Sequence, residues 1–180
     1  MMPLPVDTIL AELEQALGDS RNVVLQAPPG AGKTTRVPPA LLTASWLTGK
    51  RLVLLEPRRL AARRAADYMA RLMGQEVGQT VGYRVRLDSR VGPETRIEVV
   101  TEGVLTRLVQ RDPALEGVGA VIFDEFHERS LDGDLALALC LDLLAALNPA
   151  LRLLVMSATL ETAPLARLLG GAPLISCRGR

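Results

Sequence analysis

The chain alternates short, continuously apolar runs with longer segments whose apolar residues recur at helical spacing. Continuous runs of this kind are typical of parallel strands that are covered on both faces. Their alternation with helices predicts an α/β fold of three layers, in which a mainly parallel sheet is sandwiched between helices. We expect strands at Asn22–Gln26, Arg51–Leu55, Tyr83–Leu87, Ile97–Thr101, Ala120–Phe123, Arg152–Met156 and Pro173–Ser176.

Helices are expected before the first strand and in most of the connections. The first helix should run from Val6 to Leu17, with Asp7 as its N-cap and Gly18 as its stop. The others are expected at Arg58–Met73, Glu102–Gln110, Leu131–Leu147 and Ala163–Leu169.

The composition limits the class of protein. A chain of 180 residues fits one domain with a sizeable core, and 48% apolar but only 3% aromatic residues predict that this core is aliphatic. The formal net charge of +1 argues against a general polyanion binder, so any nucleic-acid contact must come from a local basic patch.

The cysteines and the apolar runs bear on location. Cys140 and Cys177 lack metal-ligand spacing and are expected to be reduced thiols of a cytoplasmic protein. We expect no signal peptide and no membrane span, because no apolar run reaches about 18 residues. A monomer is the default expectation. The chain ends shortly after a predicted strand, so we expect it to be the N-terminal fragment of a longer protein.

A glycine-rich segment, APPGAGKTT at residues 27–35, directly follows the first predicted strand. In phosphate loops of the pattern G-x-x-x-x-G-K-[ST], backbone N–H groups cradle phosphate, the lysine reaches the β- and γ-phosphates and the hydroxyl binds magnesium. Ala27 stands at the first glycine position, and the alternative is a glycine-rich turn with an incidental lysine. The predicted nucleotide-binding residues are Pro29, Gly30, Ala31, Gly32, Lys33, Thr34 and Thr35.

A polar segment follows the apolar run Ala120–Phe123. Asp124 should lie at the same sheet edge as the phosphate loop, where its carboxylate can bind magnesium beside Thr34. Glu125 is the candidate general base that orients an attacking water. Taken alone, this segment could also be an acidic turn that caps a helix.

The only histidine of the chain is His127, two residues after the candidate base. We assign it a catalytic, coupling role near the γ-phosphate, with a structural or surface histidine as the alternative. Ser157 and Thr159 end another apolar run at the same edge, and their hydroxyls are expected to bond the magnesium-binding segment. Ser-Ala-Thr is a weak signal by itself.

Taken together, these segments resemble the first RecA-like domain of superfamily 2 helicases, in the DEAH-box branch and most closely its bacterial HrpB type. The resemblance extends from Leu25 to about Ser176, with the motifs in the family's order. The family has alanine where this chain has Phe126, whose ring we expect between sheet and helix. The matching segments are residues 27–35 (motif I), 56–62 (EPRRLAA, motif Ia), 101–105 (TEGVL, motif Ib), 124–130 (DEFHERS, motif II) and 157–159 (SAT, motif III).

The resemblance implies contacts with single-stranded nucleic acid, with RNA as the preferred polymer. Arginines there would bind backbone phosphates without reading sequence. For Arg58 and Arg59 the alternative is a solvated helix start, and the residues next to Arg86 differ from the family's turn. The residues assigned to nucleic acid are Arg58, Arg59, Arg86, Thr101, Glu102 and Gly103.

The resemblance also implies ATP or ADP with Mg²⁺ as the bound nucleotide. Hydrolysis would need an arginine finger from a second RecA-like domain in the same protein, so the fragment should bind Mg-nucleotide weakly and hydrolyse it slowly or not at all. Tyr68 falls where DEAH-box relatives place an arginine on the adenine. Its ring can stack on a purine or can simply pack the edge of its helix.

Two other classes of protein stay open. One is a phosphate-loop switch or kinase without motor activity, although neither a kinase lid nor an acceptor site is evident. The other is a silent nucleic-acid-binding scaffold, against which the retained Lys33, Asp124 and Glu125 argue.

Overall fold

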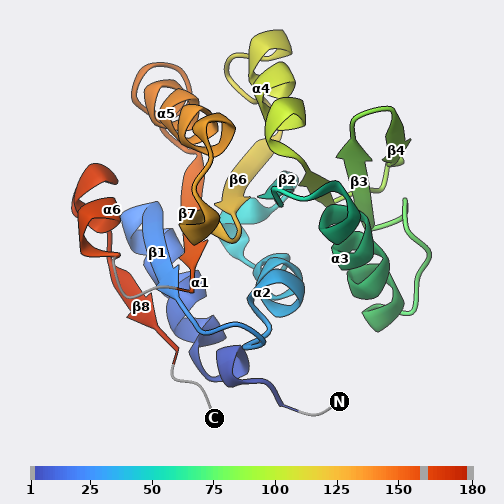
Figure 1. The fold of residues 1–180 in the computed structure, drawn as a ribbon, viewed down its shortest axis with the longest axis horizontal. Coiled ribbons are helices and arrows are strands. Elements are labelled where there is room, and N and C mark those ends of the chain that lie inside the picture. The colour runs from blue at the N-terminus through green and yellow to red at the C-terminus, as the bar shows by residue number, and fades with distance from the viewer. Residues whose placement is uncertain (1–2, 159–161, 178–180) are drawn as a thin grey trace.

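A computed structural model describes residues 3–158 and 162–177 of the chain. Its described residues form one eight-stranded sheet in the order β4-β3-β5-β2-β6-β7-β1-β8, in which only the β3–β4 pair is antiparallel (Figure 1). The expected α/β fold with a mainly parallel sheet is therefore confirmed. The strands are β1 (Asn22–Gln26), β2 (Arg51–Leu55), β3 (Val81–Val85), β4 (Asp88–Arg90), β5 (Ile97–Val100), β6 (Val118–Phe123), β7 (Arg152–Ser157) and β8 (Leu174–Ser176).

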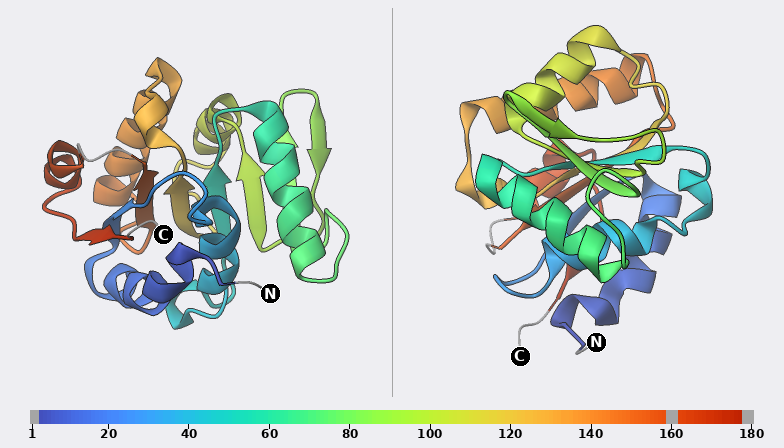
Figure 2. Two further views of the ribbon diagram at one scale, coloured as in Figure 1. Left: turned by 60° about the horizontal axis from the view of Figure 1, so that its bottom comes forward. Right: turned by 90° about the vertical axis from the view of Figure 1, so that its right-hand side faces the viewer.

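Helices cover both faces of the sheet, as the views in Figure 2 show. One face carries α1, α2 and α3, and the other carries α4, α5 and α6. The α-helices are α1 (Leu10–Ser20), α2 (Lys33–Leu41), α3 (Arg59–Leu72), α4 (Glu102–Arg111), α5 (Leu131–Ala146) and α6 (Ala163–Leu168), and the short 3₁₀ helices are η1 (Pro5–Ile9), η2 (Ser45–Leu47) and η3 (Phe126–Glu128).

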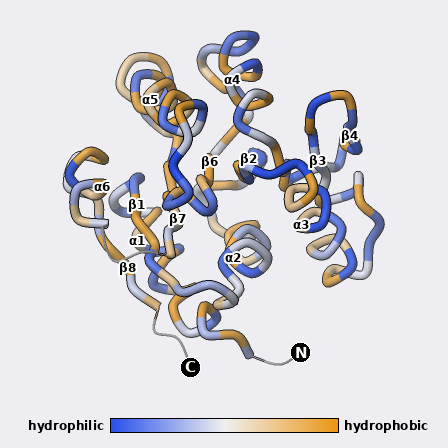
Figure 3. The backbone as a smooth tube through the Cα atoms, in the orientation of Figure 1, coloured by the Kyte–Doolittle hydropathy of each residue, from blue (hydrophilic) through white to orange (hydrophobic). Residues whose placement is uncertain are grey.

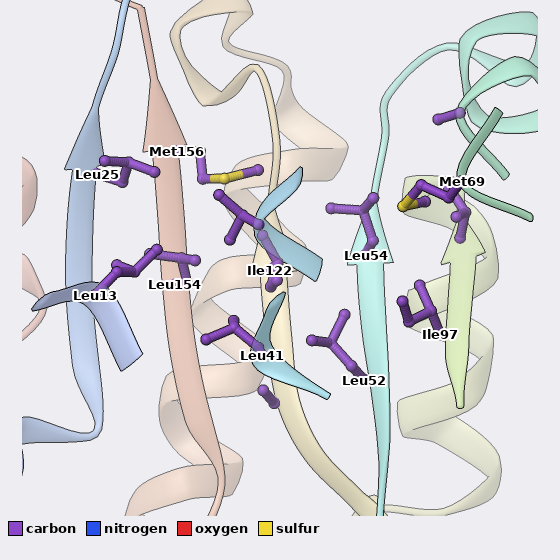
Figure 4. Close-up of a cluster of buried hydrophobic side chains, with 14 of the residues drawn as sticks. Leu13, Leu25, Leu41, Leu52, Leu54, Met69, Ile97, Ile122, Leu154 and Met156 are labelled. Atoms are coloured by element: carbon purple, nitrogen blue, oxygen red, sulfur yellow. The ribbon is translucent and has the colours of Figure 1, made fainter. Parts of the chain in front are cut away.

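Each face has its own aliphatic core, as the composition predicts. Leu13 of α1, Leu41 of α2 and Met69 of α3 pack on inward-facing residues of the central strands, among them Ile122 and Leu154 (Figure 4). Figure 3 shows the central strands as largely hydrophobic, whereas the segment between β2 and α3 is hydrophilic. This hydrophilic segment lies where the sequence predicts nucleic-acid contacts.

The N-terminal helix differs from the prediction at both ends. A 3₁₀ turn, Pro5–Ile9, precedes α1, and the Asp7 carboxylate accepts a hydrogen bond from the backbone N–H of Leu4 at 2.8 Å, so Asp7 is not the N-cap. Gly18 does not stop the helix either. The helix continues to Ser20 and ends where Arg21 adopts a φ of 63°.

The region after α3 was predicted incompletely. The strand expected at Tyr83–Leu87 starts earlier, at Val81, and pairs with a short antiparallel strand, Asp88–Arg90, that the prediction missed. Leu87 forms the turn between them, with a φ of 66°. Leu87 is 94% exposed, so its apolar side chain extended the predicted strand past the true end at Val85 although it lies outside the core.

The arrangement of the sheet determines where the polar segments lie. β1, β2, β6 and β7 run parallel, with Gln26 beside Ser157 and Leu55 beside Phe123 in register. The residues that follow these strands therefore share one edge of the sheet. Within the described ranges, no helix combines the length and apolar character that a membrane span requires.

We expect Leu154→Ala to lower the free energy of unfolding by about 2–5 kcal/mol, because it leaves a cavity under α1 and α2. Leu154 is fully buried, whereas Leu60 of α3 is 67% exposed. Leu60→Ala is the matched control and should change stability by less than about 0.5 kcal/mol. Urea unfolding followed by circular dichroism measures both. Equal losses in the two variants would contradict the assignment of this core.

Candidate nucleotide and nucleic-acid site

The glycine-rich segment forms a loop between β1 and α2. Gly32 adopts a φ of 94°, and a Cβ there would lie 2.7 Å from Leu4 Cδ1, so both backbone and packing require glycine. Backbone bonds from Ala31 N–H to Pro28 O (3.2 Å) and from Val6 N–H to Ala31 O (3.1 Å) hold the loop against the N-terminal segment. The loop is thereby presented at the N-terminus of α2, where backbone N–H groups favour anions.

Lys33 is the first residue of α2 and only 3% exposed. Its ammonium donates hydrogen bonds to the carbonyl oxygens of Ala27 at 3.0 Å and Pro28 at 3.4 Å, and lies 3.8 Å from Glu125 Oε1. The carbonyl oxygens of the loop thus hold the Lys33 ammonium beside the acidic segment. Phosphate oxygens can replace these carbonyl oxygens as its partners.

Asp124 follows β6 and is almost completely buried next to Thr34, whose hydroxyl donates a hydrogen bond to Asp124 Oδ2. Burial raises the pKa of the Asp124 carboxyl to about 6, and the nearby charge of Glu125 adds to this effect. The hydrogen bond from Thr34 and the charge of Lys33 act in the opposite direction. A buried carboxylate and a hydroxyl facing each other supply the oxygen ligands that Mg²⁺ prefers.

Glu125 lies in a left-handed backbone conformation, with φ 48° and ψ 33°. Its Oε2 is 3.2 Å from His127 Nε2, and His127 Nδ1 accepts a hydrogen bond from the backbone N–H of Ala158 at 3.2 Å. A neutral His127 therefore carries its proton on Nε2, facing Glu125. The candidate base is linked through His127 to the end of β7.

The contact through the Ala158 backbone was not part of the prediction for residues 157–159. The predicted bonds from the hydroxyls of Ser157 and Thr159 to the magnesium-binding segment stay predictions. Ser157 lies at the expected sheet edge and is buried. Thr159 lies outside the described residues.

Glu56 is a site residue that the sequence reasoning missed. It follows β2 as Asp124 follows β6, and it is only 3% exposed. Burial raises the pKa of its carboxyl to about 7, and the charge of Asp124 contributes. Its position directly after an apolar run was the signal that could have revealed it.

A cavity of about 350 Å³ lies over the phosphate loop. Tyr68 of α3, half exposed, lines it together with Gly30, Lys33, Thr34 and Glu125. The structure thus brings Tyr68 to the site that the phosphate loop forms, although α3 is far from that loop in sequence. Pro29 lies exposed in the same loop and Ala31 is buried beneath it.

The arginines predicted to contact nucleic acid also meet in space. Arg58 directly precedes α3, and the Arg59 guanidinium donates a hydrogen bond to the backbone oxygen of Arg86 at 2.8 Å. A cleft of about 730 Å³ is lined by Arg58 and Arg59 on one side and by Thr34 and Glu125 on the other. Two of the predicted nucleic-acid residues, Arg58 and Arg59, therefore border a common space with Thr34 of the phosphate loop and the candidate base Glu125.

The motif Ib residues lie at the start of α4, one strand further along the sheet. Thr101 precedes the helix and Glu102 begins it, while Gly103 is exposed and a Cβ on it would meet no atom within 4 Å. Glu102 reaches the acidic segment through Ser130, whose hydroxyl donates to Glu102 Oε1 at 2.5 Å. Open space at Gly103 leaves room for a close backbone approach.

Comparison with known proteins gives the family. Residues 9–168 match the profile described as "DEAD/DEAH box helicase". The chain belongs to the DEAD/DEAH box helicase family. It is 55% identical to the protein named ATP-dependent RNA helicase HrpB of Escherichia coli K12, over the whole of this chain and 22% of that protein. It is 38% identical to human ATP-dependent RNA helicase DHX30, over 98% of this chain and 15% of that protein.

Solved structures agree with this assignment. A crystal structure of the E. coli DExH-box NTPase HrpB superposes with a TM-score of 0.95 at 55% identity, covering all of this chain and 22% of that one. A second crystal structure of E. coli HrpB superposes with a TM-score of 0.94, over 98% of this chain and 22% of that chain. The expected resemblance to the HrpB type is confirmed, and the chain spans about a fifth of the length of HrpB.

The departure of this chain from the DEAH pattern is accommodated by packing. Phe126 is half-buried against the core of the α4–α6 face, with its ring edge-on to Phe123 at 6.1 Å between centroids. The Arg129 guanidinium lies 5.5 Å from the centre of the same ring. The ring thus packs against the core on the α4–α6 face, beside Phe123 of β6.

We expect Asp124→Asn to stabilise the chain, without ligands, above about pH 6 and to have little effect near pH 4. The folded chain raises the pKa of Asp124 from 3.8 to about 6, so the stability from its protonated form is lost as the pH rises through that range. The expected gain near pH 7.5 is about 1–3 kcal/mol.

Urea unfolding between pH 4 and 8 measures this effect. Asp19→Asn, an exposed carboxylate at the end of α1, is the control and should leave the profile unchanged. A gain for Asp124→Asn that is the same at every pH would show that ionisation of Asp124 is not its cause.

Proposed function

We propose that this chain is the nucleotide-binding domain of an ATP-dependent helicase that acts on single-stranded nucleic acid, RNA above DNA. The observation that carries the proposal is the cleft bordered by both Thr34 and Glu125 and the Arg58–Arg59 segment. A motor needs nucleotide chemistry beside a surface that binds the polymer backbone, and this cleft provides both. The relatives named ATP-dependent RNA helicases support the choice of ATP and of RNA.

Nucleotide binding would begin at the phosphate loop. The loop amides at the start of α2 would receive phosphate oxygens, and Lys33 would exchange the carbonyls of Ala27 and Pro28 for the β- and γ-phosphates. Because Lys33 is already buried and aligned, little side-chain entropy is lost in this exchange.

Magnesium fits the residues present. The Thr34 hydroxyl and the Asp124 carboxylate would hold it, and its charge would favour the ionised form of Asp124 that burial disfavours. Among the described residues, no three carboxylate, imidazole or thiolate side chains form a complete metal site, so phosphate oxygens and water must complete the coordination. Bound there, Mg²⁺ would neutralise the phosphate charge that develops in transfer.

Glu125 would orient the attacking water and accept its proton. His127 holds one carboxylate oxygen of Glu125 at 3.2 Å, and Lys33 lies 3.8 Å from the other. These contacts position the carboxylate at the mouth of the phosphate loop. Through Ala158, His127 also connects that carboxylate to the end of β7, which suits a coupling role.

Arg58, Arg59 and Arg86 would bind backbone phosphates, with Thr101, Glu102 and Gly103 extending the path across the sheet edge. Full hydrolysis would need an arginine finger from a second RecA-like domain, which stabilises charge in the transition state. The HrpB relative is several times longer than this chain, so a longer protein of this type has room for such a domain. We place the protein in the cytoplasm as a monomer, where the buried thiols of Cys140 and Cys177 stay reduced.

Isothermal titration of Mg-ADP into the chain tests the nucleotide site. Lys33→Ala should weaken binding about 10- to 100-fold, because it removes a charged donor to phosphate. Lys50→Ala makes the same chemical change at the chain's other lysine and should bind as the wild type does. Equal affinities for wild type and Lys33→Ala would refute the phosphate-loop assignment.

Adenine stacking on Tyr68 can be tested separately from phosphate binding. Tyr68→Ala should weaken Mg-ADP about 5-fold or more and leave pyrophosphate affinity unchanged, because base–aromatic stacking contributes about 1–3 kcal/mol. Tyr68→Phe keeps the ring and is the matched control. If Tyr68→Ala binds Mg-ADP as tightly as the wild type, the ring only packs the edge of α3.

A further inference from the structure

The acidic segment makes a contact on its far side that the nucleotide chemistry does not use. Glu128, three residues after the candidate base, places Oε1 2.9 Å from Nη2 of Arg58. Arg58 is 65% and Glu128 38% exposed at their side chains, so the pair lies at the protein surface, and Arg58 also lines the cleft. The closest carboxylate to the predicted phosphate-binding arginine therefore belongs to motif II itself.

The other carboxylate near Arg58 is less well placed. Glu56 Oε1 lies 4.0 Å from Arg58 Nε, and it accepts a hydrogen bond from the Arg58 backbone N–H at 3.3 Å. Glu128 thus makes the short guanidinium–carboxylate contact. A carboxylate at this distance offers the guanidinium the same charge-assisted hydrogen bond that a phosphate oxygen offers.

The end of the segment is fixed on the side of motif Ib. Ser130 accepts the backbone N–H of Gly133 at 2.9 Å as the N-cap of α5, while its hydroxyl donates to Glu102. Gly133 permits this close packing, since a Cβ there would lie 2.9 Å from Glu102 Oε1. Glu128 is therefore held between a fixed end at Ser130 and the candidate base at Glu125.

We propose that Glu128 occupies Arg58 in place of a nucleic-acid phosphate, so that a bound strand must displace Glu128 from this arginine. The inference rests on the proposed function, in which Arg58 contacts the polymer backbone. It adds a regulatory residue to that site. By competing with phosphate for Arg58, Glu128 lowers the affinity of the chain for nucleic acid.

Displacement of Glu128 also reaches the nucleotide side. The backbone N–H of Glu128 donates to the carbonyl oxygen of Glu125 at 2.9 Å, within one turn of 3₁₀ helix. A bound nucleic-acid strand that draws Arg58 away from Glu128 breaks this ion pair. The turn that holds Glu125 then loses one of its restraints. By linkage, if nucleic-acid binding changes the affinity for a nucleotide by some factor, that nucleotide changes the affinity for nucleic acid by the same factor.

The test is binding of a fluorescein-labelled 12-nucleotide oligouridylate, measured by anisotropy at low salt with the 180-residue chain. Glu128→Gln should bind about two- to fivefold more tightly than the wild type, the range expected when a competing exposed ion pair is removed. Thermal unfolding of the same samples shows whether the variant is folded.

Asp67→Asn is the matched control. Asp67 pairs with Arg71 at 2.9 Å near the far end of α3, and both side chains are exposed. The variant removes one negative charge and releases one arginine, as Glu128→Gln does, but away from the cleft. Its affinity should change less than that of Glu128→Gln.

Arg58→Ala completes the cycle. Glu128→Gln should give no gain in the Arg58→Ala background, because the competed arginine is missing. Equal gains for Glu128→Gln and Asp67→Asn, or a gain that persists without Arg58, would overturn the inference while leaving the proposed function intact. No binding by any variant, the wild type included, would overturn the nucleic-acid function and the inference together.

Discussion

The parallel alignment of β1, β2, β6 and β7 is the constraint on which the site depends. The residues that follow each of these strands lie at the same edge of the sheet. The register places Gln26 beside Ser157 and Phe123 beside Val155. The phosphate loop, Asp124 and Ala158 therefore meet although they are far apart in sequence. Parallel strands can do this only with helical crossovers, and these crossovers bury both faces of the sheet in aliphatic residues.

The same constraint crowds like charges. Glu56 and Asp124 directly follow the neighbouring strands β2 and β6, and both side chains are buried. Burial raises the pKa of both carboxyls. The folded chain thus holds these groups at a cost in stability, which builds up as the pH rises from 3.8 to about 6 for Asp124 and from 4.5 to about 7 for Glu56. Such a cost is expected where a site is arranged for a cation rather than for the stability of the empty fold.

The sequence predicted the parts of this design that follow from periodicity. Asn22–Gln26 and Arg51–Leu55 match the observed strands residue for residue, because continuous apolar runs have few other solutions. β4 was missed because Asp88–Arg90 is polar and shows no apolar pattern, and it is held by pairing with β3 and by contacts of Asp88 with Tyr83 and Arg63. The predicted helix end at Gly18 was wrong because the helix ends at the residue that leaves the helical conformation, which here is Arg21. The contacts of Glu128 with Arg58 and of His127 with Ala158 join distant segments, and no local pattern encodes them.

The segment from Asp124 to Ser130 shows why its one departure from the family pattern is tolerated. Glu125 and Arg129 both adopt positive φ, 48° and 41°, conformations that favour glycine and are strained for other residues. Between them, Phe126 packs edge-on against Phe123 in the core. A larger apolar side chain at this position buries more surface than alanine, which offsets part of that strain. The Phe126 ring lies on the core side of this turn. On the other side, Glu125 contacts Lys33, His127 contacts Ala158 and Glu128 contacts Arg58. One half-buried ring thus anchors a turn whose polar contacts reach the phosphate loop, the end of β7 and the basic segment before α3.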